Sequence, residues 1–463
     1  MKLVYNIKDK PKFGQLIIFA FQQLLAIMAA TLVVPVITNG NVLSAIESGA
    51  VTWEFNAQMS PAAALLGAGV GTLVYILFTK AKSPVFLGSS FAFLGSMAAA
   101  FAGAVSAQAG FAGLVIGATM AGLVYVVIAA IVKVAGVNWI EKLMPKQVIG
   151  PTVSIIGLSL AGNAVGDLQT APAGGHTLIA IVCGLVALLV TMLCSVFGKK
   201  TAKLIPFIIG ILSGYAVAAI FTVIGGAAGI DALKVIDFSP ITNLWADGVT
   251  INTFFQFPDF TFVQAIKGIK EVDGAYIGSL AMAYVPVAFV VFAEHIADHK
   301  NISSIIEKDL IKEPGLHRTL LGDGVGSVVG SVFGGCPNTT YGESVACVAI
   351  TGNASVATII TAAVLAILIA FVSPFVAFVN SIPSCVMGGI CMALYGFIAV
   401  SGLKMVQKVN LEDNRNLFVV SVILIAGIGG LALNFGKIQI TSIATALILG
   451  ILVNIILGKK KKA

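Results

Sequence analysis

Apolar stretches of about twenty residues recur along nearly the whole 463-residue chain, and twenty such residues are what a helix needs to cross the hydrocarbon core of a bilayer. Hydrophobic residues make up 58% of the chain and charged residues 10%, with a mean hydropathy of +1.02. Ordinary soluble domains carry roughly 25% charged residues. The sequence therefore excludes a soluble fold and predicts an all-α polytopic membrane protein.

The candidate spans number fourteen when the chain is divided into apolar stretches of this length. Three of them are poor continuous helices, because they contain glycine or runs of polar residues, and irregular backbone at membrane depth needs protein or a water-filled cavity around it. These three are 83–105, 318–334 and 338–352. The other eleven are 13–38, 61–79, 111–136, 146–166, 176–197, 203–226, 274–298, 355–379, 383–404, 416–433 and 439–457.

The basic residues give the orientation of these spans, since cytoplasmic loops collect Lys and Arg. With the N-terminus inside, all but four of the 27 Lys and Arg residues fall on the cytoplasmic side. The four exceptions are Lys234, Lys267, Lys270 and Lys437. Both termini are thus expected in the cytoplasm, and the net charge of +7 is explained without a nucleic-acid partner.

Fourteen spans divide into two halves of seven, and an odd-numbered half inserts with inverted topology relative to the other. Inverted repeats of this kind are common in secondary transporters, where broken helices at equivalent positions form a site near the bilayer midplane. The third and tenth spans are such a pair, interrupted at Gly88 and Gly342. We expect each to carry a short extended segment with free backbone groups.

Four carboxylates, Glu294, Asp298, Asp323 and Glu343, lie in or beside these apolar segments. An ionisable side chain at bilayer depth costs at least ~2.5 kcal/mol and usually marks a substrate or proton path. Glu294 and Asp298 are four residues apart and share one helical face. Either residue could instead be structural, and the glycine-rich surroundings of Asp323 favour a structural role for it. His295 is expected to point away from the Glu294 face.

The remaining histidines and the cysteines give no sign of a metal site, a cofactor or a disulfide framework. The chain has four His and six Cys residues, without the spacing of metal ligands or of CxxC motifs. His299 and His317 are expected near the cytoplasmic edge of the membrane. Nor does any nucleophile–base pair or phosphate-binding loop support an enzyme.

Several long motifs resemble one known family. They are Gln22-Gln23-Leu24-Leu25-Ala26 leading to Ala30-Thr31 and Pro35, Leu87 to Phe93, Ala293-Glu294-His295-Ile296, Lys308-Asp309-Leu310 with Glu313 to Arg318, Pro337 to Glu343, and Val386-Met387-Gly388-Gly389. In this order they resemble the nucleobase-ascorbate transporters (nucleobase:cation symporter-2), and within that family the bacterial uracil permeases.

The resemblance implies a core domain formed by spans 1–4 (13–136) and 8–11 (274–379). It also implies a gate domain formed by spans 5–7 (146–226) and 12–14 (383–457), through which two copies would dimerise. The substrate site would lie between the third, eighth and tenth spans. Its implied ligands are Glu294 and Glu343 for the N–H groups and polar edge of the base, backbone of Phe93 and Gly342 for its carbonyls, Ala30 and Tyr341 beside the ring, and Tyr395 facing it from the gate.

The implied activity is proton-coupled import of a nucleobase across the cell membrane by alternating access between core and gate. Glu294 and Asp298 would share the transported proton. Asp298 stands where uracil permeases often have His, and Ser344 where the family usually has Asn. The Thr339 to Glu343 stretch favours uracil over a xanthine- or uric acid-type purine, which stays an alternative. An anion transporter of the same architecture is a further one, disfavoured by the paired carboxylates.

Overall fold

A computed structural model of the chain describes residues 3–136, 139, 144–172, 174–199, 201–435 and 438–458. Within these ranges, eight helical stretches are long and apolar enough to cross a membrane. They are α1 (Phe13–Glu47), α2 (Pro61–Phe78), α4 (Ala107–Ala135), α6 (Lys146–Ser159) continuing into α7 (Ala161–Gln169), α8 (Thr177–Phe197), α10 (Pro206–Ala228), α14 (Gly274–Ile306) and α19 (Ser384–Val406).

Shorter elements complete the fold. The apolar helices among them are η1 (Phe91–Phe93) with α3 (Leu94–Ala102), α16 (Gly342–Thr351), α17 (Val356–Ile369), α20 (Asn414–Ile428) and α21 (Ser442–Gly458). The others are α9 (Thr201–Leu204), η2 (Asp231–Leu233), α11 (Ser239–Thr242), η3 (Asn243–Trp245), α12 (Ile251–Phe254), α13 (Thr261–Gly268), η4 (Ile269–Glu271), η5 (Ile311–Gly315), α15 (Leu316–Gly334) and α18 (Ser373–Asn380). The strands are β1 (Leu87–Ser89), β2 (Asn338–Thr340), β3 (Leu433–Phe435) and β4 (Ile438–Ile440).

The two broken segments of the chain pair with each other. Strands β1 and β2 are antiparallel, with Gly88 opposite Thr339, and the pairing extends at both ends. Ser90 N donates to Pro337 O at 2.9 Å, and Tyr341 N donates to Phe86 O at 3.2 Å. Each broken segment therefore supplies the backbone partners that the other lacks, which irregular backbone at membrane depth requires.

Side chains satisfy the backbone groups that the strand pair leaves over. Thr72 on α2 accepts a hydrogen bond from Leu87 N at 2.9 Å. Ser344 on α16 accepts one from Phe86 N at 3.0 Å, and Gln23 on α1 reaches the same hydroxyl at 2.5 Å. Three helices are thereby joined to one short strand, which fixes the start of α16 relative to α1.

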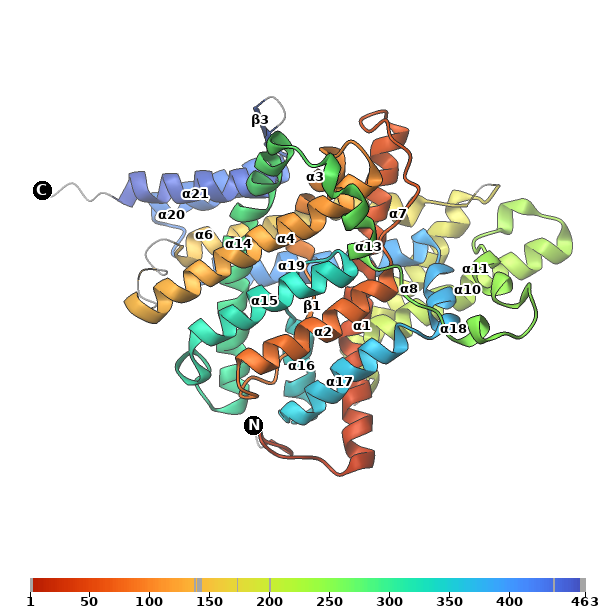
Figure 1. Ribbon diagram of the computed structural model, residues 1–463, viewed down its shortest axis with the longest axis horizontal. Coiled ribbons are helices and arrows are strands. Elements are labelled where there is room, and N and C mark those ends of the chain that lie inside the picture. The colour runs from red at the N-terminus through yellow and green to blue at the C-terminus, as the bar shows by residue number, and fades with distance from the viewer. Residues whose placement is uncertain are drawn as a thin grey trace, which may run out of the picture.

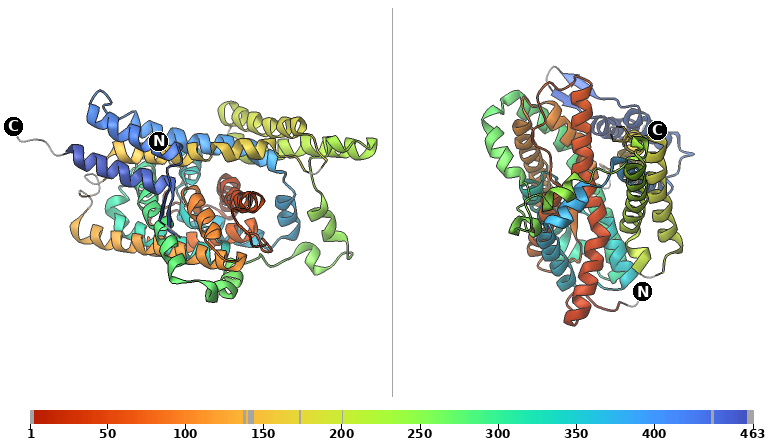
Figure 2. Two further views of the ribbon diagram at one scale, coloured as in Figure 1. Left: turned by 90° about the horizontal axis from the view of Figure 1, so that it is seen from above. Right: turned by 90° about the vertical axis from the view of Figure 1, so that its right-hand side faces the viewer.

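The helices pack as two groups (Figures 1 and 2). In one group α1, α2, α4, α14, α15 and α17 contact one another and enclose the strand pair. In the other, α6, α7, α8, α10, α19, α20 and α21 contact one another. Seen from above, the second group forms a layer along one side of the molecule and α4 lies on the opposite side (Figure 2). Fewer contacts join the groups, among them a hydrogen bond from Asn163 to Asn41.

Glycines bring α2 and α15 together backbone to backbone. A Cβ atom on Gly67 would lie 2.5 Å from Gly330 O, and one on Gly71 would lie 2.7 Å from Gly326 O. Small residues allow this close approach between membrane helices, where packing has to replace the hydrophobic effect. Asn338 of β2 donates to Gly67 O at 3.1 Å, so the strand pair rests directly on this contact.

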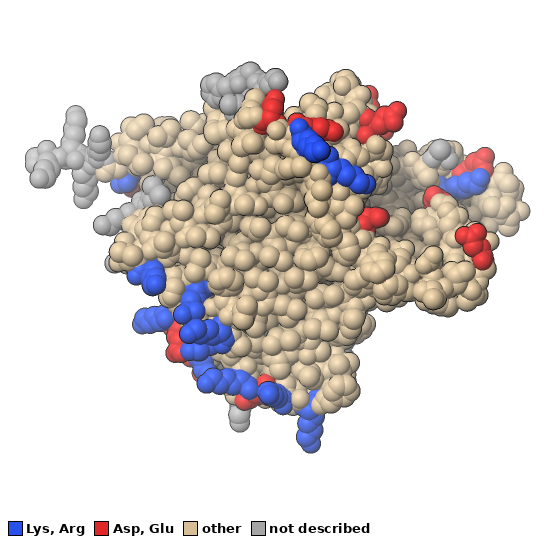
Figure 3. Space-filling view, in the orientation of Figure 1, with Lys and Arg blue, Asp and Glu red and all other residues tan. Residues whose placement is uncertain are grey.

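Charged side chains lie at two opposite edges of the molecule (Figure 3). In this view Lys and Arg gather at the lower left, other charged residues lie along the top and right, and a broad uncharged band separates them. Exposed apolar side chains on α4, α8 and α10 match such a band, for example Leu123, Val127, Leu189 and Val223. A surface of this kind fits the hydrocarbon layer of a bilayer.

Several predicted spans differ from the observed elements. The first helix continues to Glu47 instead of ending near Thr38, and the continuous span predicted over 355–379 is wrong, because α17 ends at Ile369 and α18 begins at Ser373. Pro374 lacks an N–H and is favoured in the first turn of a helix, which explains the new start at Ser373. A β3–β4 hairpin, not predicted, joins α20 to α21.

Some of the basic residues on which the predicted orientation depends lie outside the described part of the chain. The basic residues outside the described part of the chain are Lys2, Lys142, Lys200, Lys437 and Lys459 to Lys462. The cytoplasmic position of both termini therefore stays a prediction.

The glycine contact can be tested with Gly67→Ala. The added methyl would collide with Gly330 O, and overpacking typically costs ~1–3 kcal/mol. We expect a lower unfolding temperature of the purified protein in detergent. Gly40→Ala is the matched control, since a Cβ there meets nothing within 4 Å; equal stability of the two variants would contradict the packing argument.

Candidate functional site

A cavity of about 370 Å³ lies between the two helix groups. The first group lines it with residues of α1, η1, α14, β2 and α16: Ala26, Phe91, Ala92, Ala293, Glu294, Ala297, Asp298, Thr339, Thr340, Tyr341, Gly342, Glu343, Ala346, Cys347 and Ile350. The second group lines it with residues of α6, α9, α10 and α19: Ile149, Val153, Ile156, Lys203, Leu204, Pro206, Phe207, Leu394, Phe397, Ile398, Ser401 and Met405.

Helix α14 contributes two carboxylates to the cavity. Glu294 and Asp298 are one turn apart, so both side chains lie on the face that lines it. Asp298 Oδ2 accepts a hydrogen bond from Thr340 Oγ1 at 2.7 Å. The neighbouring Thr339 is also a lining residue, but its hydroxyl is buried and has no hydrogen-bond partner among the described residues. Glu294 thus offers a carboxylate acceptor to a bound molecule.

The start of α16 faces the same space. Gly342 is its first residue, and Glu343 lies in its first turn. The first N–H groups of a helix have no partner within the helix, and the helix dipole places partial positive charge there. Gly342 is exposed in the cavity and a Cβ on it would meet nothing within 4 Å. The α16 start therefore offers a carboxylate acceptor, from Glu343, beside the backbone N–H donor of Gly342.

An aromatic ring is fixed directly before this helix. The Tyr341 hydroxyl donates to Ser89 O at 2.7 Å, and the ring lies against Gly88, where a Cβ would come within 2.4 Å of it. Glycine at position 88 is therefore needed for the tyrosine to lie against the strand. Phe91, from the other broken segment, lines the cavity as well.

The second helix group presents a mostly apolar wall. Ile156 on α6, Phe207 on α10 and Phe397 on α19 are examples. Lys203 is the one basic side chain among the described residues that line the cavity, and it is exposed. The polar chemistry is consequently concentrated on the side of the strand pair.

The cavity brings together five of the eight residues predicted from the sequence. Glu294, Asp298, Tyr341, Gly342 and Glu343 line it. The other three are buried behind the lining: Phe93 stacks on Tyr284 with ring centroids 5.6 Å apart, Ala30 is one turn beyond the lining residue Ala26, and Tyr395 lies edge-on to Phe91 at 6.0 Å.

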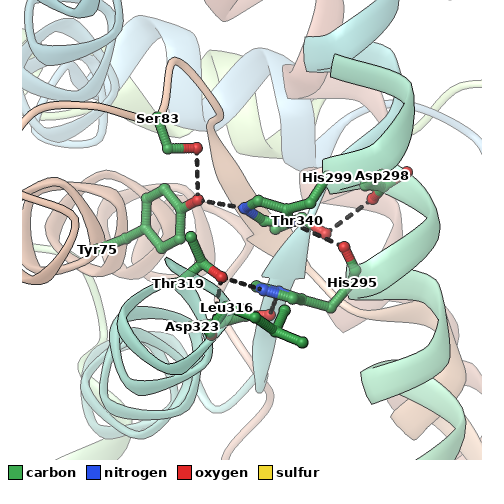
Figure 4. A network of polar contacts seen from close by, with 9 residues as sticks. All are labelled: Tyr75, Ser83, His295, Asp298, His299, Leu316, Thr319, Asp323 and Thr340. Carbon is green, nitrogen blue, oxygen red and sulfur yellow. Dashed lines mark hydrogen bonds and ion pairs between the residues drawn. The ribbon is translucent and has the colours of Figure 1, made fainter. Parts of the chain in front are cut away.

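A polar network lies behind the carboxylates, inside the first helix group (Figure 4). Two histidines of α14 belong to it, with their rings stacked 4.0 Å apart. His299 Nδ1 contacts His295 O at 2.8 Å and must donate, because a carbonyl only accepts. His299 Nε2 lies 2.7 Å from the Tyr75 hydroxyl, and the same hydroxyl lies 2.7 Å from Ser83 Oγ. His299 is thus fully enclosed by protein, and its position near the cytoplasmic edge of the membrane stays a prediction.

The second histidine connects α14 to α15. His295 Nδ1 lies 2.6 Å from Asp323 Oδ2, and Nε2 lies 3.0 Å from Thr319 Oγ1. The threonine hydroxyl donates to Leu316 O, so it accepts from Nε2. One proton lies between His295 and Asp323, and neither side chain has any exposed surface. His295 points away from the cavity that Glu294 lines, as predicted, and Asp323 is placed as a structural partner.

Sequence reasoning missed several residues of this site. Phe91 and Thr340 adjoin predicted residues, and the alternation of an extended segment could have selected Thr340. Ser344, considered only as a departure from a family pattern, joins α16 to β1 and α1. Tyr75 gave no signal, because its partner His299 is 224 residues away in the sequence.

The fold is that of known membrane transporters. The murine anion transporter Slc26a9, solved in an inward-facing state, matches 97% of this chain and 69% of its own with a TM-score of 0.64 at 10% identity. The transmembrane domain of the cyanobacterial bicarbonate transporter BicA matches 98% and 100% with a TM-score of 0.54 at 16% identity. Such low identity shows the fold alone. Together with the long apolar helices, it defines a multi-pass membrane protein.

A family model described as "Permease family" (Xan_ur_permease) matches residues 14–435. The chain belongs to this family, the nucleobase-ascorbate transporters, which are transporters and not enzymes. Among its relatives are a uracil permease of Bacillus caldolyticus, 37% identical over 100% of this chain and 96% of the relative, and one of Bacillus subtilis, 35% identical over 100% and 97%. A uracil permease of Escherichia coli is 33% identical over 96% and 92%.

The role of Asp323 as a structural partner can be tested with Asp323→Ala. This change leaves His295 Nδ1 buried without its partner, and an unsatisfied buried polar group costs about 1–3 kcal/mol. We expect a clear fall in the unfolding temperature. Asp247→Ala, at an exposed aspartate in the connection between η3 and α12, is the control and should leave the unfolding temperature nearly unchanged. An unaltered Asp323→Ala protein would exclude the structural role.

Proposed function

We propose that this protein is a proton-coupled symporter that imports a nucleobase, with uracil as the first candidate. The observation that carries the proposal is the start of α16, where the Glu343 carboxylate and the backbone N–H of Gly342, which has no partner within the helix, border one cavity. A lactam ring presents N–H donors and C=O acceptors in one plane, which such a pair complements. Relatives that align over nearly their whole length are named uracil permeases.

In this proposal the base lies between the two broken segments. Glu294 and Glu343 accept hydrogen bonds from the ring N–H groups, and backbone at Gly342 and Phe93 meets the ring carbonyls. Tyr341 flanks the ring, with Ala30 and Tyr395 supporting the walls from behind. Tyr341 is held against Gly88 by its bond to Ser89 O, so it offers the base a pre-ordered surface.

The proposed architecture is fourteen spans in two inverted repeats of seven. The core domain would comprise 13–136 and 274–379, and the gate domain 146–226 and 383–457. Support comes from the antiparallel pairing of β1 with β2, segments that stand at equivalent positions of the two halves. We further propose cytoplasmic termini and a homodimer formed through the gate domains.

Alternating access would come from movement of the core against the gate. The gate side of the cavity is almost wholly apolar and makes few polar contacts with the core, so it can slide without breaking hydrogen bonds to the base. The lining extends to Lys203 and Met405, residues on the side that the charge bias predicts to be cytoplasmic. The state described here would therefore be an inward-facing one.

Proton coupling is assigned to Glu294 and Asp298. Two carboxylates one turn apart on the same cavity wall repel each other when both are ionised, so a shared proton relieves the repulsion. Thr340 donates to Asp298 and also belongs to the strand that leads to Glu343. Occupancy of the base site and protonation of the pair would be linked through this strand.

Anion transport is disfavoured by the same residues, although the structurally similar transporters named above include an anion transporter and a bicarbonate transporter. Glu294, Asp298 and Glu343 all line the cavity, and among its described residues only Lys203 offsets them. An anion would be repelled from such a site.

Binding is tested first with purified protein and a panel of uracil, xanthine and uric acid, measured by thermal shift. We expect selective stabilisation by uracil. Glu343→Ala should weaken it about 10- to 150-fold in Kd, the equivalent of about 1.5–3 kcal/mol for a hydrogen bond to a charged group. The exposed Glu412→Ala serves as the control. Stabilisation by a purine alone would replace uracil with that purine as the proposed substrate. No response to any base would refute nucleobase binding.

Coupling is tested by uptake into proteoliposomes with an imposed pH gradient. A protonophore should collapse accumulation by the unaltered protein. Glu294→Gln, which removes the ionisable group and keeps the shape, should abolish gradient-driven uptake, whereas Glu412→Gln should not. Normal accumulation by Glu294→Gln would refute its role in proton transfer.

A further inference from the structure

A second cavity, of about 480 Å³, lies at the edge of the molecule away from the nucleobase site. It is formed by the N-terminal segment, the end of α2 and the connection from α14 to α15. Its lining residues are Ile7, Lys8, Lys82, Lys308, Asp309, Leu310, Lys312 and Glu313. Half of these residues are lysines, an unusual concentration for a small pocket.

The positive charges in this pocket are only partly neutralised. Lys82 Nζ lies 2.5 Å from Glu313 Oε1, and Lys312 Nζ lies 3.7 Å from Asp309 Oδ2. These pairs account for both acidic residues of the lining. Lys8 and Lys308 are exposed, and their side-chain ammonium groups form no hydrogen bond or ion pair with any residue in the described part of the chain. Two ammonium groups are therefore available to a ligand.

The positive charges of these lysines stabilise the ionised form of the neighbouring Glu313 carboxyl. A hydrogen bond from Lys82 and the charge of Lys82 lower the pKa of the Glu313 carboxyl, and the charges of Lys8 and Lys308 lower it further. Lysines from three separate segments of the chain thus act on the same carboxyl group. A negatively charged group that entered the pocket would meet the same field.

Lys8 is held in position although it lies close to the N-terminus. Ala354 N donates to Tyr5 O at 2.9 Å, and Val356 N donates to Ile7 O at 3.1 Å. Tyr5 also forms a parallel bridge with Asn353, and Ile7 is buried. The segment before α1 is therefore part of the folded core, and Lys8 is presented to the pocket by fixed backbone.

The pocket borders the apolar surface of the protein. Leu77, near the end of α2, is 75% exposed and lies five residues before Lys82. Phe13, the first residue of α1, is 80% exposed and lies five residues after Lys8. The basic edge in Figure 3 likewise adjoins the broad uncharged band. Exposed apolar side chains thus lie a short stretch of chain away from two of the lysines that line the pocket.

We propose that this pocket binds the phosphodiester headgroup of an anionic phospholipid such as phosphatidylglycerol. Lys8 and Lys308 would contact the phosphate, and the acyl chains would lie against the exposed apolar ends of α1 and α2. Basic pockets between membrane helices bind anionic headgroups in this manner. The apolar border favours a lipid over a soluble phosphate, which would gain nothing from Leu77 and Phe13.

The test compares lipids by thermal shift in detergent, with phosphatidylglycerol titrated against phosphatidylcholine at low ionic strength. We expect phosphatidylglycerol to raise the unfolding temperature by several degrees more than phosphatidylcholine, and the difference to shrink as salt is added. In the K8Q/K308Q variant the difference should fall by more than half. K8R/K308R, which keeps both charges, should retain it.

The control variant is K267Q/K270Q, which removes two exposed lysines on the opposite side of the predicted membrane and should respond like the unaltered protein. Equal losses in K8Q/K308Q and K267Q/K270Q would overturn the proposal, because the effect would then follow total charge. Stabilisation by inorganic phosphate as large as that by phosphatidylglycerol would also overturn it, in favour of a soluble anion. The unfolding temperatures in phosphatidylcholine alone report whether each variant is folded.

Discussion

Backbone hydrogen bonding at membrane depth is the constraint on which this structure depends. A helix satisfies its own backbone, but a transporter needs free donors and acceptors near the middle of the bilayer, and each costs several kcal/mol if it faces hydrocarbon. Here the two broken segments satisfy each other through β1 and β2, and Thr72 and Ser344 complete the arrangement. The N–H of Gly342 at the start of α16, which has no partner within the helix, lies at the cavity.

The two walls of the cavity differ in their chemistry. The wall built on the strand pair carries the carboxylates, the hydroxyls and the helix N-terminus, and its residues are joined by hydrogen bonds to α1 and α2. The opposite wall is nearly apolar. Polar recognition needs fixed geometry, whereas an apolar surface tolerates sliding. Selectivity and movement can consequently reside in different helix groups of one chain.

Much of this organisation could be predicted from the sequence, because the relevant signals are local. Runs of apolar residues gave most helices, and Gly88 and Gly342 marked the two breaks. Carboxylates in apolar surroundings gave Glu294, Asp298 and Glu343, all of which line the cavity. The α17–α18 break was missed because hydropathy continues through it, and the β3–β4 hairpin was missed because its strands are only three residues long. The Tyr75–His299 contact depends on packing between distant segments, which no local pattern records.

The attachment of the first residues to the core has a practical consequence. Residues 4–7 are hydrogen-bonded to the Gly352–Val356 connection, which directly follows α16, the helix that carries Glu343. The segment before the first membrane helix therefore holds this connection in place through backbone hydrogen bonds. A bulky fusion joined to the N-terminus would pull on the connection that anchors the far end of α16, so a protein intended for functional work is better fused elsewhere.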